Sequence, residues 1–212
     1  MGKFSKGILG GFSGKVGNVV GGNWKGIDYM RSKSSYKNLN PSEAQLTQQL
    51  KFGMCIRFVQ SMSGLLEKTF NNFAVKKTGI NSALSYTLKN AVTGTYPLFT
   101  IDYANVLVSR GDLPNVLGPA IVMGADSLLV YSWTDNTGVG VARATDNAIP
   151  VAYCPDFNQC IYLTAGAARS SLTETLNLSS FTGKTVETYL SFASENGQNV
   201  ASSIYTGSIL VS

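Results

Sequence analysis

Apolar residues recur with two different periods along this chain, and the change of period indicates how the chain is organised. Over the middle of the chain the spacing is that of one side of a helix, whereas over the C-terminal half apolar and polar residues alternate as in strands. The N-terminal part is rich in glycine and basic residues and follows neither period for long. Three segments are therefore predicted, over 1–40, 41–95 and 96–212.

The segment over 41–95 is predicted to hold two helices. Asn40 suits an N-cap, Pro41 the first helical position and Glu43 a capping box, so the first helix should begin there. Its apolar side consists of residues at helical spacing: Leu46, Leu50, Met54, Phe58, Met62 and Leu65. Gly64 is a position at which this helix can end or bend. A second helix is predicted over 80–92.

The C-terminal segment is predicted to form an antiparallel β-sandwich of the immunoglobulin or fibronectin type III kind, so that the fold class is α+β. Seven short strands separated by turn residues are expected: 101–109, 128–133, 148–154, 159–164, 172–178, 185–193 and 203–211. Trp133 should be buried, because it shares a strand face with Leu129 and Tyr131. The inter-sheet disulfide of antibody domains is missing, which favours the fibronectin-like variant.

The N-terminal segment, 1–40, is predicted to form a basic, glycine-rich hairpin arm. Strands are expected over 15–20 and 24–31, with Gly21 and Gly22 as the turn between them, since both can adopt a positive φ. The few apolar side chains here cannot form a core, and an isolated hairpin is marginal in water. The arm should therefore dock on the rest of the chain, on another subunit or on a different partner.

The distribution of charge singles out the same arm. The chain has a net charge of +5, yet residues 1–40 alone hold seven basic side chains and one acid, Asp28. Such asymmetry indicates an acidic partner: nucleic acid, a protein or a membrane surface. Aromatic and basic residues interleave here, and they are the candidate residues for binding protein or nucleic acid: Lys15, Trp24, Lys25, Tyr29, Arg31, Lys33, Tyr36 and Lys37. In the alternative interpretation, the lysines only protect an edge strand from aggregation.

The sequence predicts no cofactor, no metal and no catalytic residues. It has no histidine, so the commonest general base and metal ligand is missing. The run over 10–16 resembles a phosphate-binding loop, but Leu9 replaces its first glycine and Val16 the hydroxyl residue that would bind magnesium. Three acids near turns are more often backbone partners than calcium ligands: Asp135, Asp146 and Asp156. A serine or cysteine nucleophile is left open, although nothing places a base beside one.

Three cysteines, Cys55, Cys154 and Cys160, and the lack of a secretory signal indicate a reducing compartment, so buried free thiols are expected. A disulfide between Cys154 and Cys160 across a tight hairpin is the alternative. No apolar run is long enough to span a membrane, and Lys6 interrupts a myristoylation motif. The protein is expected in the cytoplasm or in a virion.

Five stretches carry a likeness to other proteins: 7–33, 83–91, 132–136, 143–146 and 187–189. They resemble a family of uncharacterised Bacteroidota proteins of similar length. The resemblance implies a bacterial or bacteriophage context and supplies no catalytic residues. Together with the arm and the sandwich, it favours a non-enzymatic structural or interaction protein that assembles with itself or with a partner through the arm, for example as a virion component. The alternatives are a nucleic-acid-binding protein that uses the same arm and a hydrolase on a β-scaffold.

Overall fold

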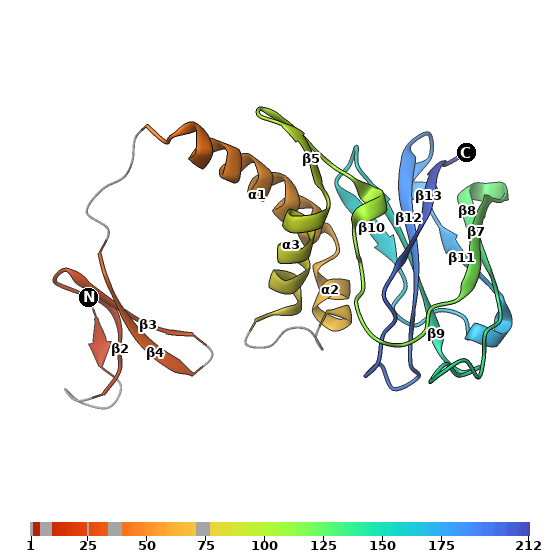
Figure 1. Ribbon diagram of the computed structural model, residues 1–212, viewed down its shortest axis with the longest axis horizontal. Helices are drawn as coiled ribbons and strands as arrows, with labels where there is room; N and C mark the ends of the chain where they lie inside the picture. Colours follow the sequence, from red (N-terminus) through yellow and green to blue (C-terminus); the bar gives the residue numbers. More distant parts are fainter. Residues whose placement is uncertain (1, 5–9, 25, 34–39, 71–76) are drawn as a thin grey trace. The chain divides into compact units, whose positions relative to one another are not determined.

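The computed structural model describes residues 2–4, 10–24, 26–33, 40–70 and 77–212, and the chain divides into two units, Met1–Glu43 and Ala44–Ser212. It contains α-helices and several antiparallel sheets, which confirms the α+β class (Figure 1). No helix within the described ranges is long and apolar enough to cross a membrane.

The N-terminal unit is an antiparallel sheet whose strands lie in sequence order. Its strands are β1 (Lys3–Phe4), β2 (Phe12–Val16), β3 (Val19–Trp24) and β4 (Ile27–Ser32). A tight turn at Gly17 joins β2 to β3, so that Val16 pairs with Val19. Gly17 has a φ of +59°, which glycine adopts without strain. The two-stranded hairpin predicted for this segment is therefore a four-stranded sheet.

Gly21 and Gly22 lie inside β3, so the turn predicted at these two residues is wrong. Each glycine makes room for an aromatic ring from a neighbouring strand. A Cβ on Gly21 would overlap Phe12, and one on Gly22 would lie 2.9 Å from the Tyr29 hydroxyl. Glycine within a strand often marks such a close approach. These glycines thus serve contacts across the sheet rather than turn geometry.

The second unit begins with three helices: α1 (Glu43–Ser61), α2 (Ser63–Thr69) and α3 (Gly79–Asn90). The first helix predicted from the sequence is two helices, because the chain leaves helical geometry at Met62, which is the N-cap of α2. Gly64 lies within α2 and does not mark the break. Thr78 caps α3: its hydroxyl oxygen accepts from the Asn81 backbone N–H at 3.2 Å. The second helix is confirmed, with its start one residue earlier than predicted.

Seven strands form two sheets after the helices. They are β7 (Leu117–Met123), β8 (Leu128–Thr134), β9 (Asn147–Cys154), β10 (Gln159–Tyr162), β11 (Thr173–Asn177), β12 (Thr185–Ala193) and β13 (Ile204–Leu210). The four-stranded sheet has the order β10-β9-β12-β13, and the three-stranded sheet has the order β11-β8-β7. A hairpin of β5 (Val92–Thr95) and β6 (Leu98–Ile101) precedes them. The connections contain the 3-10 turns η2 (Tyr103–Asn105), η3 (Ala125–Ser127), η4 (Arg169–Ser171) and η5 (Ser179–Phe181).

The four-stranded sheet is covered on both faces, by the helices on one side and by the three-stranded sheet on the other (Figure 1). On the helical side, the ring of Phe58 in α1 meets Tyr153 of β9 edge-on, with centroids 4.8 Å apart. Between the two sheets, side chains of both layers form a common core: Leu129, Tyr131, Trp133, Ala148, Ala152, Leu190 and Phe192. The two sheets therefore have a sandwich-like arrangement, and the prediction that Trp133 is buried is confirmed.

Strand β9 consequently reads as an apolar run, and β12 buries most of its side chains although it also contains polar residues. Every residue of β9 from Ala148 to Cys154 is buried. Alternate side chains contribute to the two cores, so that Val151 and Tyr153 contact the helical side while Ala152 faces the other sheet. Continuous burial of this kind requires a cover on each face.

One of the seven strands predicted for the C-terminal segment is wrong, whereas the other six are confirmed with ends that shift by at most two residues. The range 101–109 leaves the sheet after β6, because Asp102 caps the turn η2 by accepting from the Ala104 N–H. Strand β7 is not predicted because Gly118 and Pro119 suggest a turn. Pro119 is accommodated there because β7 is an edge strand with a break in register beside it.

We expect Trp133→Ala to destabilise the second unit by about 3–5 kcal/mol, because it empties a large site in the core between the sheets. The Trp133 Nε1–H donates to the Arg169 carbonyl at 2.8 Å, and its ring meets Phe192 edge-on with centroids 5.2 Å apart. Urea denaturation followed by circular dichroism measures the loss. Trp24→Ala is the control, since Trp24 is 54% exposed in the N-terminal unit. Equal effects of the two variants on this transition would contradict the assignment.

Candidate functional site

Four of the described candidate residues of the N-terminal segment share one face of its sheet. Opposed residues of an antiparallel pair point to the same side, as do alternate residues along a strand. Lys15 pairs with Val20, which in turn pairs with Arg31. Tyr29 precedes Arg31 by two residues on β4, and Trp24 follows Val20 by four on β3, so both lie on this face. We call it the aromatic–basic face: Lys3, Lys15, Trp24, Ile27, Tyr29 and Arg31.

The register therefore brings together four of the predicted binding residues, Lys15, Trp24, Tyr29 and Arg31. Lys33 follows the end of β4, and its backbone N–H donates to the Asn18 carbonyl at 2.7 Å. The other three lie outside the described residues: Lys25, Tyr36 and Lys37.

The acidic side chain of this sheet lies on the opposite face. Asp28 pairs with Asn23, whose side-chain N–H donates to Asp28 Oδ1 at 2.7 Å. The rest of this opposite face is largely apolar and includes Phe12, Val16, Val19 and Met30. Among the described residues of the sheet, the aromatic–basic face thus has three cationic side chains and no carboxylate.

The two aromatic side chains of the aromatic–basic face are open to solvent. Trp24 is 54% and Tyr29 47% exposed. The Tyr29 ring reaches across to β3 and covers Gly22, where a Cβ would lie 3.0 Å from its Cζ. One side of this ring therefore rests on the neighbouring strand and the other remains available to a planar group.

A buried ion pair joins the loops at one end of the sandwich. Arg169 is fully buried, and its Nη2 lies 3.1 Å from Asp146 Oδ2. The guanidinium also donates to Asn136 Oδ1 at 2.6 Å and to the Pro114 carbonyl at 2.9 Å. Its carbon lies 4.5 Å from the centroid of the Phe192 ring. One cation thus connects four separate segments of the chain, and the charge is fully partnered.

The acids that the sequence analysis weighed as calcium ligands have other partners in the structure. Asp146 accepts from the Arg143 backbone N–H at 2.8 Å in addition to its ion pair. Hydrogen bonds from the Thr137 hydroxyl and backbone N–H hold the pKa of Asp135 below its ordinary value. Asp156 forms an exposed ion pair with the lysine that precedes β12. Within the described ranges, no group of three or more cysteines and acids is placed to hold a metal ion.

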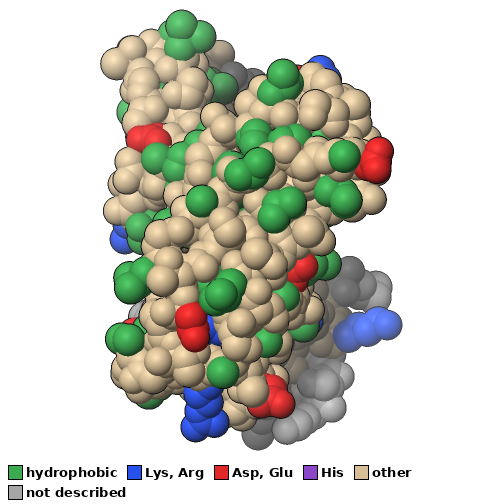
Figure 2. Space-filling model, turned by 90° about the vertical axis from the view of Figure 1, so that its right-hand side faces the viewer, with side chains coloured by type: hydrophobic (Ala, Val, Ile, Leu, Met, Phe, Trp, Pro, Cys, Tyr) green, Lys and Arg blue, Asp and Glu red, His purple; other side chains and the backbone are tan. Residues whose placement is uncertain are grey.

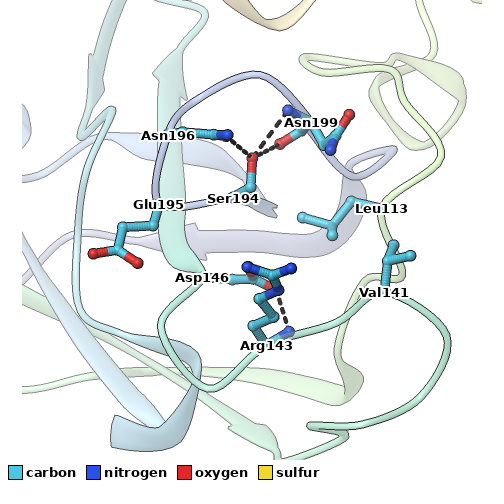
Figure 3. Close-up of a pocket in the computed structure, with 8 residues that line it drawn as sticks. All are labelled: Leu113, Val141, Arg143, Asp146, Ser194, Glu195, Asn196 and Asn199. Carbon is cyan, nitrogen blue, oxygen red and sulfur yellow. Dashed lines mark hydrogen bonds between the residues drawn. The ribbon is translucent and has the colours of Figure 1, made fainter.

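A pocket of about 490 Å³ opens beside Asp146 (Figure 3). One wall is the loop after β12, in which the Ser194 hydroxyl bonds the Asn196 side chain at 2.8 Å and the Asn199 carbonyl at 3.1 Å. Arg143 and Glu195 line the pocket with opposite charges. Every buried side-chain nitrogen or oxygen in the described residues has a hydrogen-bond partner. Several polar groups of the pocket therefore bond one another, and the arrangement points to no particular ligand.

The three cysteines are free thiols. Cys154 pairs with Gln159 and Cys160 with Tyr153, so the two cysteines point to opposite faces of the sheet. This register rules out the disulfide between them. Burial raises the pKa of the Cys55 thiol to about 11 and also raises that of Cys160.

The outer face of the three-stranded sheet has no charged side chain. Register places these residues on it: Ala120, Val122, Leu128, Val130, Ser132, Thr134, Thr173, Thr175 and Asn177. We call it the neutral face. Val122 is 62% exposed at its edge, and Figure 2, which views the molecule from the side of β7, β8 and β11, shows hydrophobic side chains among uncharged ones here. Apolar patches without charge often mark contact surfaces.

The fold and these surfaces define an α+β protein, mostly of β-structure, with two chemically distinct exposed faces. Residues 11–207 match a family of unknown function (DUF6266), and the chain belongs to that family. The matched range includes β2, β3 and β4 as well as most of the second unit. No curated protein and no solved structure matches the chain.

We expect Asp146→Asn to destabilise the second unit by about 3–5 kcal/mol, because it leaves the Arg169 charge buried without its counterion. Asp156→Asn is the matched control. Its ion pair with Lys184 spans 2.9 Å but is exposed and screened by solvent, so its loss should cost far less than the loss of the buried pair. Urea denaturation of both variants measures the difference. Similar losses would mean that the buried pair does not hold the loops together.

We expect the thiols of the folded protein to react slowly with a disulfide reagent at about pH 8, because a raised pKa leaves little thiolate. Cys55 and Cys160 have raised pKa values, and Cys154 is buried. After unfolding in guanidinium, all three should react rapidly. Time-resolved absorbance of the released thiol measures both rates, and rapid labelling of the native chain would contradict this packing.

Proposed function

We propose that this protein is a non-enzymatic interaction protein whose N-terminal sheet binds an acidic partner through the aromatic–basic face. The observation that carries the proposal is the register that aligns Lys15, Tyr29 and Arg31 on one face and leaves Asp28 on the other. A surface with charge of one sign is complementary to a surface of the opposite sign and repels others, so it selects both the partner and the side of approach.

The exposure of large side chains supports binding rather than mere protection of an edge strand. Trp24, Ile27 and Tyr29 are all exposed on the same face as the cations. Lysines alone suffice to protect an edge, and exposed apolar groups work against that purpose. Tryptophan, tyrosine and arginine are also the residue types that contribute most to binding energy at interfaces.

The neutral face supports a second part of the proposal, that the protein is a component of a larger assembly such as a homo-oligomer or a virion part. Two copies can approach through a surface without charge and meet no like-charge repulsion, although each chain has a net charge of +5. A location in the cytoplasm or in a phage particle, and a bacterial context, belong to the same proposal and rest on the sequence resemblance.

We further propose that the sandwich is of the immunoglobulin or fibronectin type III kind. Support comes from the division of seven antiparallel strands into sheets of three and four. The chain also changes sheet between β8 and β9, between β10 and β11 and again between β11 and β12, as Greek-key sandwiches do.

Retention of the full chain on heparin, a sulfated polyanion, tests the docking face. We expect Lys15→Gln/Arg31→Gln to elute at clearly lower salt than the unchanged protein, because it removes the row of cations beside Tyr29. The matched control, Lys68→Gln/Lys89→Gln, removes the same charge from exposed positions on α2 and α3. If the control lowers the eluting salt as much, net charge alone explains retention and the face is not the binding surface.

A further inference from the structure

We propose that the partner of the aromatic–basic face is single-stranded nucleic acid, with the bases stacked on Trp24 and Tyr29 and the phosphates beside the cations. This inference rests on the proposed function and specifies the chemistry of its ligand. It follows from how the aromatic and basic side chains are ordered along the sheet, which net charge alone does not determine.

The aromatic groups form a platform of two neighbouring rings. Tyr29 leans over Gly22, so its ring lies against β3, and Trp24 stands two residues farther along the same strand and on the same face. Gly22 and Trp24 are alternate residues of β3, so their backbones are about 6.6 Å apart. A ring above each of these positions can take one base, since a stacked base needs only a free π-face.

The cations lie in the next row of the sheet. Val20 and Arg31 are each two residues from the pair formed by Gly22 and Tyr29, and Lys15 completes that row on β2. A strand of nucleic acid whose bases cover the rings therefore has positive side chains beside its backbone. Guanidinium and ammonium groups bind phosphate oxygens, and release of counterions adds to the affinity.

The exposed rings favour a single strand over a duplex. Paired bases hide their faces in the stack, so a duplex could use the cations of this sheet but not Trp24 or Tyr29. Asn23 and Asp28, whose amide and carboxylate groups could also read base edges, lie on the opposite face and bond each other. Binding should accordingly depend little on base sequence.

Fluorescence anisotropy of the full chain with labelled oligothymidylate, oligouridylate and a DNA duplex tests the inference. At about 50 mM salt we expect both single strands to bind more tightly than the duplex, with affinity falling steeply by about 200 mM. Trp24→Ala and Tyr29→Ala should each weaken single-strand binding by about 5- to 100-fold and leave the duplex nearly unaffected. Unequal affinities for the two single strands would show whether DNA or RNA is preferred.

Two control variants separate stacking from other effects. Met30→Ala changes an exposed residue of the opposite face and should bind as the unchanged chain does. Trp24→Phe keeps an aromatic face and should restore most of the affinity lost in Trp24→Ala. If that rescue fails while circular dichroism reports an intact sheet, stacking at Trp24 is refuted.

The outcomes distinguish this inference from the proposed function. If heparin retention depends on Lys15 and Arg31 but no oligonucleotide binds, the inference is overturned. It is also overturned if the alanine variants of Trp24 and Tyr29 bind single strands normally. In either case an acidic protein is the partner. If neither heparin nor any oligonucleotide binds through this face, the proposed function fails as well.

Discussion

Strands β9 and β12 bury side chains on both faces of their sheet, and the need for two covers organises the second unit. Helices α1, α2 and α3 cover one face, and the sheet of β11, β8 and β7 covers the other. The loops at the strand ends are then connected through Arg169, whose guanidinium bonds Asp146, Asn136 and the Pro114 carbonyl. The central sheet and this cation are thus fully occupied by packing and hydrogen bonds, which agrees with the proposal that the unit acts as a scaffold.

The N-terminal sheet differs because it has few residues with which to build a core. Strand β4 is exposed along its whole length, and Phe12 and Tyr29 cover glycines of β3 instead of packing together. A unit this small gains limited stability from burying its own apolar surface. A bound partner would therefore stabilise the sheet as well as occupy it. Under the proposed function, the placement of Asp28 away from Lys15 and Arg31 would decide from which side an acidic partner approaches.

Strands with a regular apolar pattern could be predicted from the sequence, and the bounds of β12 agree to the residue. Strand β7 could not be predicted, because Gly118 followed by Pro119 is typical of a turn. Only the structure shows that the chain runs along a sheet edge at these residues. The burial of Arg169 could not be predicted from the sequence either. Its counterion, Asp146, is 23 residues away in the chain, and the residues next to Arg169 give no sign that this arginine is buried. The interleaving of aromatic and basic residues pointed to the candidate site. The strand register that aligns Lys15 with Arg31 and places both beside Tyr29 could not be predicted. The glycines suggested a turn at the wrong position, and the register depends on where the turns are.

The central claim is that the aromatic–basic face is the binding surface of this protein. The most direct test is an NMR titration of the ¹⁵N-labelled full chain with oligothymidylate. The account predicts that the amide signals of Lys15, Tyr29 and Arg31 and the indole N–H signal of Trp24 shift together and saturate at one ratio. The side-chain amide signals of Asn23, on the opposite face, and signals from the second unit should move little. Shifts confined to the second unit, or spread equally over both faces of the N-terminal sheet, would contradict the account.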